Sequence, residues 1–177
     1  MKLTSQQLQI RVATEADLRA LVDVEEAESK AKYVNEALGV TPAVLEAIGW
    51  GDVRAAKYRE RYLADDRGRM WVAEVDGKVV AYAAAKKEDQ ANRLAKMYVA
   101  GAYQRQGIGQ ALLNAAEAWL GQTKEIWLGV ASYDRTGIDF YYRHGYREGG
   151  SRLPEHTTVP AAGVVIPETL MIKRFMA

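Results

Sequence analysis

The chain has 177 residues, 49% of them hydrophobic, and its 24 basic and 23 acidic side chains leave a formal net charge of +1. This length fits the range of roughly 100 to 200 residues per domain, so we expect one domain over residues 1–177. A nearly neutral chain has no overall field that attracts nucleic acid or a phospholipid surface, so neither partner is expected. The absence of cysteine excludes disulfides, thiolate metal sites and cysteine nucleophiles.

Nothing in the sequence indicates a targeting segment or a metal site. Residues 1–17 lack the apolar core of a signal peptide, and no apolar run approaches the roughly 18 residues that a membrane helix needs. We therefore expect a cytoplasmic protein with no membrane partner. The two histidines, His144 and His156, lie apart in a chain without cysteine, which does not favour a bound metal.

The first third of the chain predicts one strand followed by two helical regions. Residues 8–12 alternate apolar and polar side chains, as a half-buried strand does. Thr14, with Asp17 three residues later, can cap a first helix. Residues 41–63 begin with Thr-Pro, a typical helix start, and we expect an interruption near Gly49.

The middle of the chain predicts a hairpin and a third strand. The apolar runs 70–75 and 79–84 are separated by Asp76-Gly77, a pair that favours a type I′ turn. A further strand over residues 94–99 leads into a glycine-containing loop.

The second half predicts two more helices and three strands. Apolar residues over 108–120 share one helix face, and Gly121 provides the stop. Residues 125–130 read as a buried strand, Asp134 can cap a short helix that ends at Gly145, and strands follow from Tyr146 and over 169–175. The resulting order, β-α-α-β-β-β-α-β-α-β-β, predicts an α/β fold with a mixed sheet.

The loop before the helix at residues 108–120 has the properties of an anion site. The first amides of a helix have no intrahelical acceptor, and the helix dipole adds partial positive charge there. Gly107 and Gly109 allow close approach of the backbone, and Arg105 adds a cation. The loop is neither a GxGxxG dinucleotide motif nor a Walker loop, because Leu112 replaces the third glycine and no Lys-Ser or Lys-Thr follows.

Three segments together resemble the GNAT N-acetyltransferases. They are the QxxGxG pattern at 104–109, the strand at 126–130, and the YxxxG motif with an aromatic ending at 140–146. The resemblance covers roughly residues 94–146. It implies the GNAT fold, with helices on both faces of the sheet and the sheet splayed between its two central parallel strands.

The resemblance also implies a binding site for acetyl-CoA as co-substrate, with no metal. Loop amides would hold the pyrophosphate, and the preceding strand would pair its backbone with the pantetheine arm. The implied coenzyme-binding residues are Met97, Tyr98, Val99, Gln104, Arg105, Gln106, Gly107, Ile108, Gly109, Gln110, Asp134 and Tyr141.

Two of these residues have further implied roles. Tyr141 matches the family tyrosine near the coenzyme sulfur and is the expected catalytic general acid. A phenol of pKa about 10 donates to a thiolate of pKa about 8.5 at a cost of roughly 2 kcal/mol, so it assists without being essential. Asp134 stands where the family often has asparagine, and a carboxylate can cap the helix but cannot donate to a pantetheine carbonyl.

The base that accepts the proton of the amine stays open at this point. Some family members use a glutamate on the strand before the loop, but residues 94–99 contain no carboxylate. A water chain to bulk solvent is one alternative. The candidate side chains are Glu25, Glu26, Glu28, Glu74 and Glu155.

The predicted activity is transfer of an acetyl group from acetyl-CoA to a primary amine. Similarity of residues 126–150 to spermidine/spermine acetyltransferases makes a polyamine one candidate acceptor, which acidic residues between Asp23 and Glu28 could bind. The alternatives are a peptide or protein N-terminal acetyltransferase and a non-catalytic coenzyme A sensor. The variable segments 30–63 and 152–166 would form the acceptor side, and the last strand could pair across a homodimer.

Overall fold

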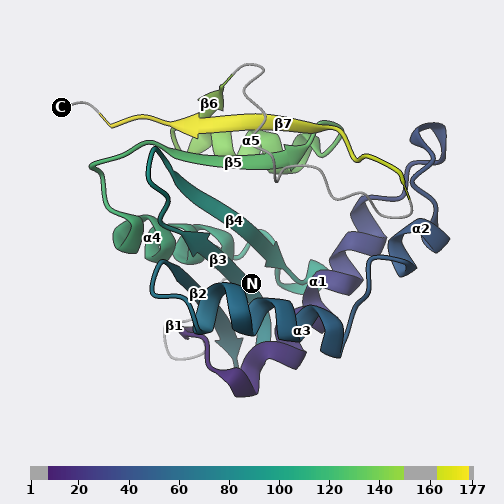
Figure 1. Cartoon of the computed structure of the whole chain (residues 1–177), viewed down its shortest axis with the longest axis horizontal. Helices are drawn as coiled ribbons and strands as arrows, with labels where there is room; N and C mark the ends of the chain where they lie inside the picture. The colour runs from purple at the N-terminus through teal and green to yellow at the C-terminus, as the bar shows by residue number, and fades with distance from the viewer. Residues whose placement is uncertain (1–7, 150–162, 176–177) are drawn as a thin grey trace.

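The computed structural model describes residues 8–149 and 163–175, and these form one mixed sheet of seven strands (Figure 1). The strand order across the sheet is β1-β2-β3-β4-β5-β7-β6. All neighbours are antiparallel except β4 and β5. The strands are β1 (Leu8–Val12), β2 (Gly68–Val75), β3 (Lys78–Lys86), β4 (Asn92–Val99), β5 (Ile126–Ala131), β6 (Arg147–Glu148) and β7 (Glu168–Lys173).

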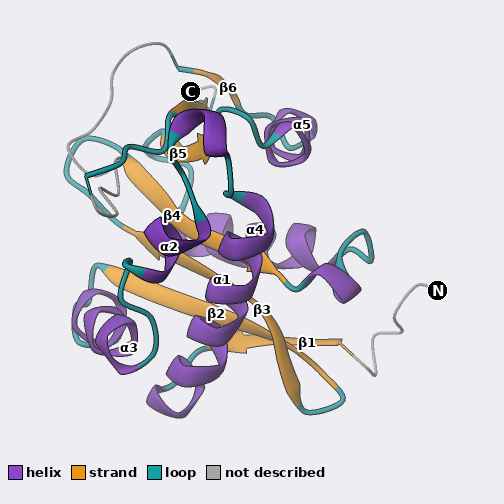
Figure 2. Cartoon of the chain, turned by 90° about the vertical axis from the view of Figure 1, so that its right-hand side faces the viewer, coloured by secondary structure: helices purple, strands orange, loops and turns teal. Residues whose placement is uncertain are grey.

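The helices follow the predicted order, with the second helical region divided in two (Figure 2). Gly49 and Gly51 have φ of 77° and 63°, values that a helix interior does not allow, so the chain turns between α2 and α3. The helices are α1 (Leu18–Lys32), α2 (Pro42–Glu46), α3 (Asp52–Tyr58), continued by a π-helical turn over Arg59–Leu63, α4 (Ile108–Leu120) and α5 (Arg135–Arg143). No helix within the described ranges is both long and apolar enough to cross a membrane.

The sheet buries apolar side chains on both faces. Trp71 and Ala83 belong to a core shared with Leu112 and other residues of α4. Val72 and Tyr82 point to the other face, into a core with residues of α1 and α3. Because successive side chains of a strand alternate between faces, helices on both faces can pack on the same strands. The predicted α/β fold is confirmed.

The two parallel strands separate soon after they meet. β4 and β5 pair only at Asn92–Ile126 and Arg93–Trp127, and beyond this point the described strands share no further register. Figure 1 shows β4 running away from β5 towards α1. On their outer sides β4 stays paired with β3 and β5 with β7. The expected splay of the sheet is therefore confirmed, and it opens the centre of the molecule.

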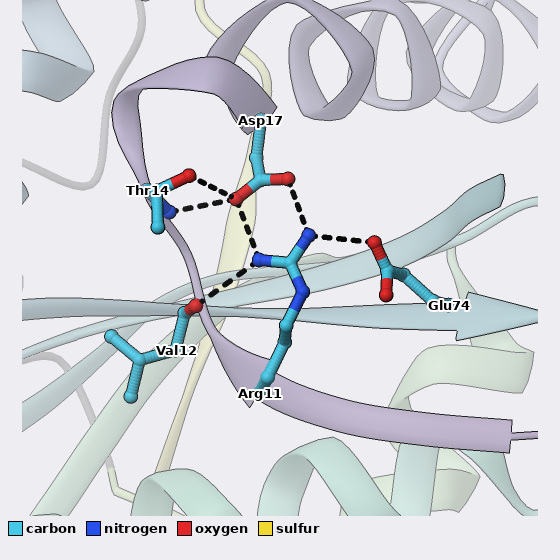
Figure 3. Close-up of polar contacts among 5 residues, drawn as sticks. All are labelled: Arg11, Val12, Thr14, Asp17 and Glu74. Atoms are coloured by element: carbon cyan, nitrogen blue, oxygen red, sulfur yellow. Dashed lines mark hydrogen bonds and ion pairs between the residues drawn. The ribbon is translucent and has the colours of Figure 1, made fainter. Parts of the chain in front are cut away.

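An ion-pair cluster fixes the start of α1 to the edge of the sheet (Figure 3). Arg11 on β1 donates to Asp17 at 2.7 and 2.8 Å and to Glu74 on β2 at 2.6 Å. Asp17 also accepts from the backbone amide and hydroxyl of Thr14, at 2.7 and 2.9 Å. The hydrogen bond from Arg11 lowers the pKa of Asp17 to about 2 against the opposing effect of burial.

This cluster predicts a pH-dependent contribution to stability. Replacing Arg11 by Met should lower the free energy of unfolding at neutral pH by about 1–2 kcal/mol, after allowance for solvent screening of the partly exposed arginine. A lowered pKa stabilises the fold above the ordinary pKa of Asp17, so the difference should shrink as the pH falls from about 4 to about 2. Urea unfolding at both ends of this range measures it. Arg19→Met, which breaks only exposed pairs with Asp23 and Asp52, is the control.

Candidate active site

A cavity of about 640 Å³ lies where β4 and β5 separate. One side, here named the α4 side, is lined by the loop before α4 and by α5, including Gln104, Arg105, Gly107, Gly109 and Tyr141. The opposite α1 side is lined by residues of α1, the α2–α3 region, β4 and β7, including Glu25, Lys32, Trp50, Arg54, Lys96 and Glu168. The separation of two parallel strands thus creates one cavity with two chemically different sides.

The start of α4 presents backbone donors on the α4 side. Gly107, with φ of 90°, is the residue before the helix, and Ala111 is the first residue whose amide bonds back, to the Gly107 carbonyl at 3.0 Å. Within the part of the chain that the structure describes, the amides of Ile108, Gly109 and Gln110 have no backbone acceptor. These donors fit a phosphate, and a β-carbon added at Gly107 would meet no atom within 4 Å.

The three polar side chains of this loop have different surroundings. Arg105 lines the cavity, with an unusual φ of 58°, and its side chain can reach a bound anion. Gln106 donates its side-chain amide to the Ala102 carbonyl at 3.0 Å, outside the cavity lining. Gln104 donates to the Val99 carbonyl at 2.8 Å and to Glu28 at 2.9 Å, so its side chain braces the loop against α1.

Among the described residues, the inner edge of β4 has no strand partner over its second half, where the Gln104 side chain reaches only the Val99 carbonyl at its end. Met97, Tyr98 and Val99 pair with β3 on one side, and all three line the cavity on the other. β5 offers them no strand partner in the described structure. An extended ligand with amide groups can add to such an edge through backbone hydrogen bonds.

Asp134 and Gly137 form the start of α5. The Asp134 carboxylate accepts from the Gly137 amide at 2.9 Å and also lines the cavity. A β-carbon on residue 137 would lie 2.7 Å from that carboxylate, which explains why glycine stands there. The capping role of Asp134 is confirmed by this geometry.

Tyr141 is the buried hydroxyl of the α4 side. Its side chain lines the cavity, and its ring packs edge-on against Phe140 and Tyr146 at centroid distances of 5.2 and 5.6 Å. Burial raises the pKa of Tyr141 well above its ordinary value, so the phenol keeps its proton. Tyr141 is therefore a hydrogen-bond donor at neutral pH.

Several carboxylates considered as bases are held in other roles. Glu74 binds Arg11 at the sheet edge, and Glu26 pairs with Lys30 at 2.6 Å. Glu28 accepts from the Gly101 amide at 2.7 Å and from Gln104. Glu155, like His156, lies outside the described residues.

Glu25 lines the cavity but is held as an anion. It accepts a hydrogen bond from the buried Tyr58 hydroxyl, and the Lys96 Nζ lies 3.2 Å from its carboxylate. Burial opposes ionisation, yet the charges of Lys96 and Arg54 outweigh it and lower the pKa of Glu25. A carboxylate with a lowered pKa and three partners is a poor proton acceptor.

Sequence reasoning did not single out Glu168, and it placed His144 outside the site, although both residues line the cavity. Glu168, at the start of β7, lies opposite Ala131 of β5 and lines the α1 side. Burial raises the pKa of Glu168 to about 7, although Lys96 and Arg93 act against this shift. His144, interpreted from sequence as a surface cation, lines the α4 side and donates from Nδ1 to the Phe140 carbonyl at 2.7 Å. The position of Glu168 depends on the pairing of β7 with β5, which no local pattern reveals.

Comparison with known proteins places this architecture among acetyltransferases. Residues 66–148 match the family model described as an acetyltransferase (GNAT) domain. An uncharacterized N-acetyltransferase of Mycobacterium bovis is 28% identical over 116 residues, which cover 64% of this chain and 74% of that protein.

Solved structures share the whole fold at low identity. The PaiA N-acetyltransferase of Thermoplasma acidophilum, solved in complex with coenzyme A, superposes with a TM-score of 0.72 at 19% identity, over 95% of this chain and 99% of that one. The ribosomal-protein-S18-alanine N-acetyltransferase of Escherichia coli gives a TM-score of 0.67 at 20% identity, over 96% of each chain. Residues 66–148 therefore match a GNAT acetyltransferase domain, and the described structure has the fold of these N-acetyltransferases.

Proposed function

We propose that residues 1–177 form one cytoplasmic domain that transfers the acetyl group of acetyl-CoA to a primary amine. The observation that carries this proposal is that the free amides at the start of α4 and the unpaired edge of β4 lie in the same cavity. The amides and Arg105 would hold the pyrophosphate, and the backbone of residues 97–99 would hold the pantetheine arm. The bound thioester would supply an activated acetyl carbon.

Residues of both sides of the cavity would then serve a direct transfer. The amine nitrogen forms a bond to the acetyl carbon as the carbon–sulfur bond breaks. The ammonium group of the acceptor first gives one proton to Glu168, which passes it to solvent. The Tyr141 hydroxyl gives its proton to the departing sulfur, and the second proton that the nitrogen loses as the amide forms restores the phenol. We assign Glu168 as general base and Tyr141 as general acid, with Asp134 as a helix cap beside the coenzyme.

The raised pKa of Glu168 supports its role. An alkylammonium of pKa about 10.4 loses its proton to a carboxylate of ordinary pKa only at a cost of about 8 kcal/mol. With the pKa at about 7, the cost falls to about 4–5 kcal/mol. A half-buried base with a pKa near neutrality also argues for turnover rather than a sensor that only binds coenzyme A.

The test is release of free thiol by the purified protein. Acetyl-CoA is mixed with separate panels of polyamines, amino acids and peptides, and coenzyme A is measured with a thiol reagent. Acceptor-dependent release supports the proposed function, and the panel that responds separates a small-molecule enzyme from a peptide acetyltransferase. Calorimetric binding of coenzyme A with no release on any panel would instead favour a sensor.

Removing the Tyr141 hydroxyl should slow turnover moderately. Tyr141→Phe is expected to lower kcat by about tenfold, because one hydrogen bond to a charged leaving group contributes about 1.5 kcal/mol or more. Acetyl-CoA affinity should change little, since the hydroxyl acts on charge that develops during transfer. Steady-state kinetics and calorimetry measure the two effects. An unchanged kcat would remove Tyr141 from the catalytic residues, and Tyr142→Phe, at a half-buried neighbour that does not line the cavity, is the control.

A further inference from the structure

The α1 side of the cavity is not the acidic groove that a polyamine requires. Of the acidic residues on α1, Asp23 pairs with Arg19 at 2.9 Å, and Glu26 and Glu28 are bound as described above. Only Glu25 among them lines the cavity. Its charge is already met by Lys96, so α1 leaves no free anion for a second ammonium group.

Cations instead exceed carboxylates on this side. The charged residues that line it are Glu25, Lys32, Arg54, Lys96 and Glu168. Lys96 and Glu25 form a close pair at 3.2 Å. Lys32 lies 3.9 Å from Glu28, and Arg54 lies 3.6 Å from the Glu25 carboxylate that Lys96 already meets. Within the described part of the chain, Arg54 and Glu168 are then the cation and the carboxylate of this side without a close partner of their own. An acceptor that carries both an anionic group and an amine would match these two charges.

Arg54 has hydrogen-bond donors to spare. Its Nη2 lies 3.6 Å from the Glu25 carboxylate, beyond hydrogen-bond distance, and its Nε is buried without a hydrogen-bond partner in the described structure. The guanidinium packs over the rings of Trp50 and Tyr58, at 5.0 and 5.7 Å from their centroids. The stacked rings hold the guanidinium plane, and a planar fork with free N–H groups binds carboxylate or phosphate in a bidentate manner.

The phosphates of the coenzyme are not the anions that Arg54 would meet. Arg54 belongs to α3, and the adjacent Ala55 and Tyr58 pack in the core on the α1 face of the sheet. The free amides begin α4, whose apolar residues pack on the opposite face. The two anion-binding features therefore lie on different sides of the cavity.

We propose that the acceptor is an amine that also carries a carboxylate or phosphate, with this anionic group bound by Arg54 and the amine directed towards Glu168. The proposal rests on the proposed function and narrows its acceptor class. Arg54 acts here as a binding residue that sets specificity.

Matched acceptors of equal chain length test the charge preference. The three series are ω-amino acids, ω-aminoalkyl phosphates and α,ω-diamines, each assayed by thiol release. The wild-type protein should prefer one anionic series over the diamines by about ten- to a hundredfold in kcat/KM, the range expected for a charge-assisted hydrogen bond. The better of the two anionic series identifies carboxylate or phosphate as the bound group.

Substitution of Arg54 separates recognition from folding. Arg54→Lys keeps a cation near Glu25 but loses the planar fork, and Arg54→Met loses both. The preference for anionic acceptors should weaken in the first variant and vanish in the second, mainly through KM. Coenzyme A affinity by calorimetry should stay at the wild-type value in both. Arg59→Met, at an arginine just after α3 that binds Glu15 at the surface, is the control and should keep the preference.

Two outcomes would overturn this inference while leaving the proposed function intact. The first is a preference for diamines in the wild-type protein, and the second is an unchanged preference for anionic acceptors in Arg54→Met. Absence of both coenzyme A binding and thiol release would instead overturn the proposed function itself.

Discussion

Glu168→Gln is expected to lower kcat for acetyl transfer by at least about a hundredfold, the lower end of the range for loss of a general base. Glutamine keeps the size and hydrogen-bonding capacity of the side chain but cannot accept a proton from an ammonium group. Coenzyme A affinity should not change, because Glu168 lies on the α1 side of the cavity. Steady-state kinetics with the best acceptor, together with calorimetry, give both values.

The pH profile gives a second measurement of the same role. The charged groups that act on Glu168 are Lys96 and Arg93 of β4, which lower its pKa. Burial prevails and places the Glu168 pKa at about 7. In the wild-type protein kcat/KM should therefore rise as the pH passes about 7, and in Glu168→Gln this limb of the profile should be absent.

Glu168→Gln should lower activity but raise the stability of the fold at alkaline pH. A carboxyl group whose pKa rises on folding stabilises the fold below its unfolded pKa of 4.5, and this contribution is lost as the pH rises to about 7. At pH about 8 the wild-type protein bears the full cost of a buried charge. Glu168→Gln should then be more stable by about 1–2 kcal/mol, a figure reduced for the solvent that reaches this half-buried group.

Glu125→Gln is the matched control for these measurements. Glu125 precedes β5 and pairs with Arg174 at the surface, at 2.6 Å. Its substitution should alter neither kcat nor the pH profile. A Glu168→Gln variant that keeps wild-type kcat would show that the proton leaves by another route, such as water, and would end the assignment of Glu168 as base.

Local sequence signals predict most of this fold because each depends on neighbours in the chain. Asp76-Gly77 adopts positive φ at both positions, 51° and 76°, as the predicted type I′ turn requires. Thr14 and Asp17 contact each other as predicted for a capped start. The apolar face of residues 108–120 is buried as its helical period indicates.

The acceptor side could not be predicted in the same way because its residues meet only in the folded sheet. Glu25 and Lys96 are 71 positions apart and form a pair on the α1 face. Glu168 lies beside the cavity because β7 inserts between β5 and β6, a pairing that the sequence leaves open. The raised pKa of Glu168 follows from burial, which requires the tertiary structure. The resemblance of residues 126–150 suggested a polyamine acceptor that acidic residues of α1 could bind, but the sequence does not reveal the cations that pair with those residues.

The second large expected effect is a loss of coenzyme A affinity on substitution of Gly107. Gly107→Glu is expected to reduce coenzyme A affinity to below detection by calorimetry. The substitution places a carboxylate beside the amides of Ile108 and Gly109, where the phosphate charge must bind, and like charges in contact repel strongly. A side chain at this position also fills space that the structure leaves open next to the loop. Gly107→Ala, without the charge, should lose about ten- to a hundredfold in affinity by hindering a charge-assisted hydrogen bond.

Gly77 provides a control that separates backbone strain from ligand exclusion. It has φ of 76° in the hairpin between β2 and β3, against 90° at Gly107, and a β-carbon at either position meets no atom within 4 Å. Gly77→Glu and Gly107→Glu therefore carry a similar conformational cost and the same added charge, and thermal unfolding should show similar losses of stability. Only Gly107→Glu should lose coenzyme A. Equal affinity in both variants would mean that the amides at the start of α4 do not bind the pyrophosphate. If they did bind it, a carboxylate beside them in Gly107→Glu would weaken coenzyme A binding, whereas the carboxylate in Gly77→Glu lies in the hairpin and would not.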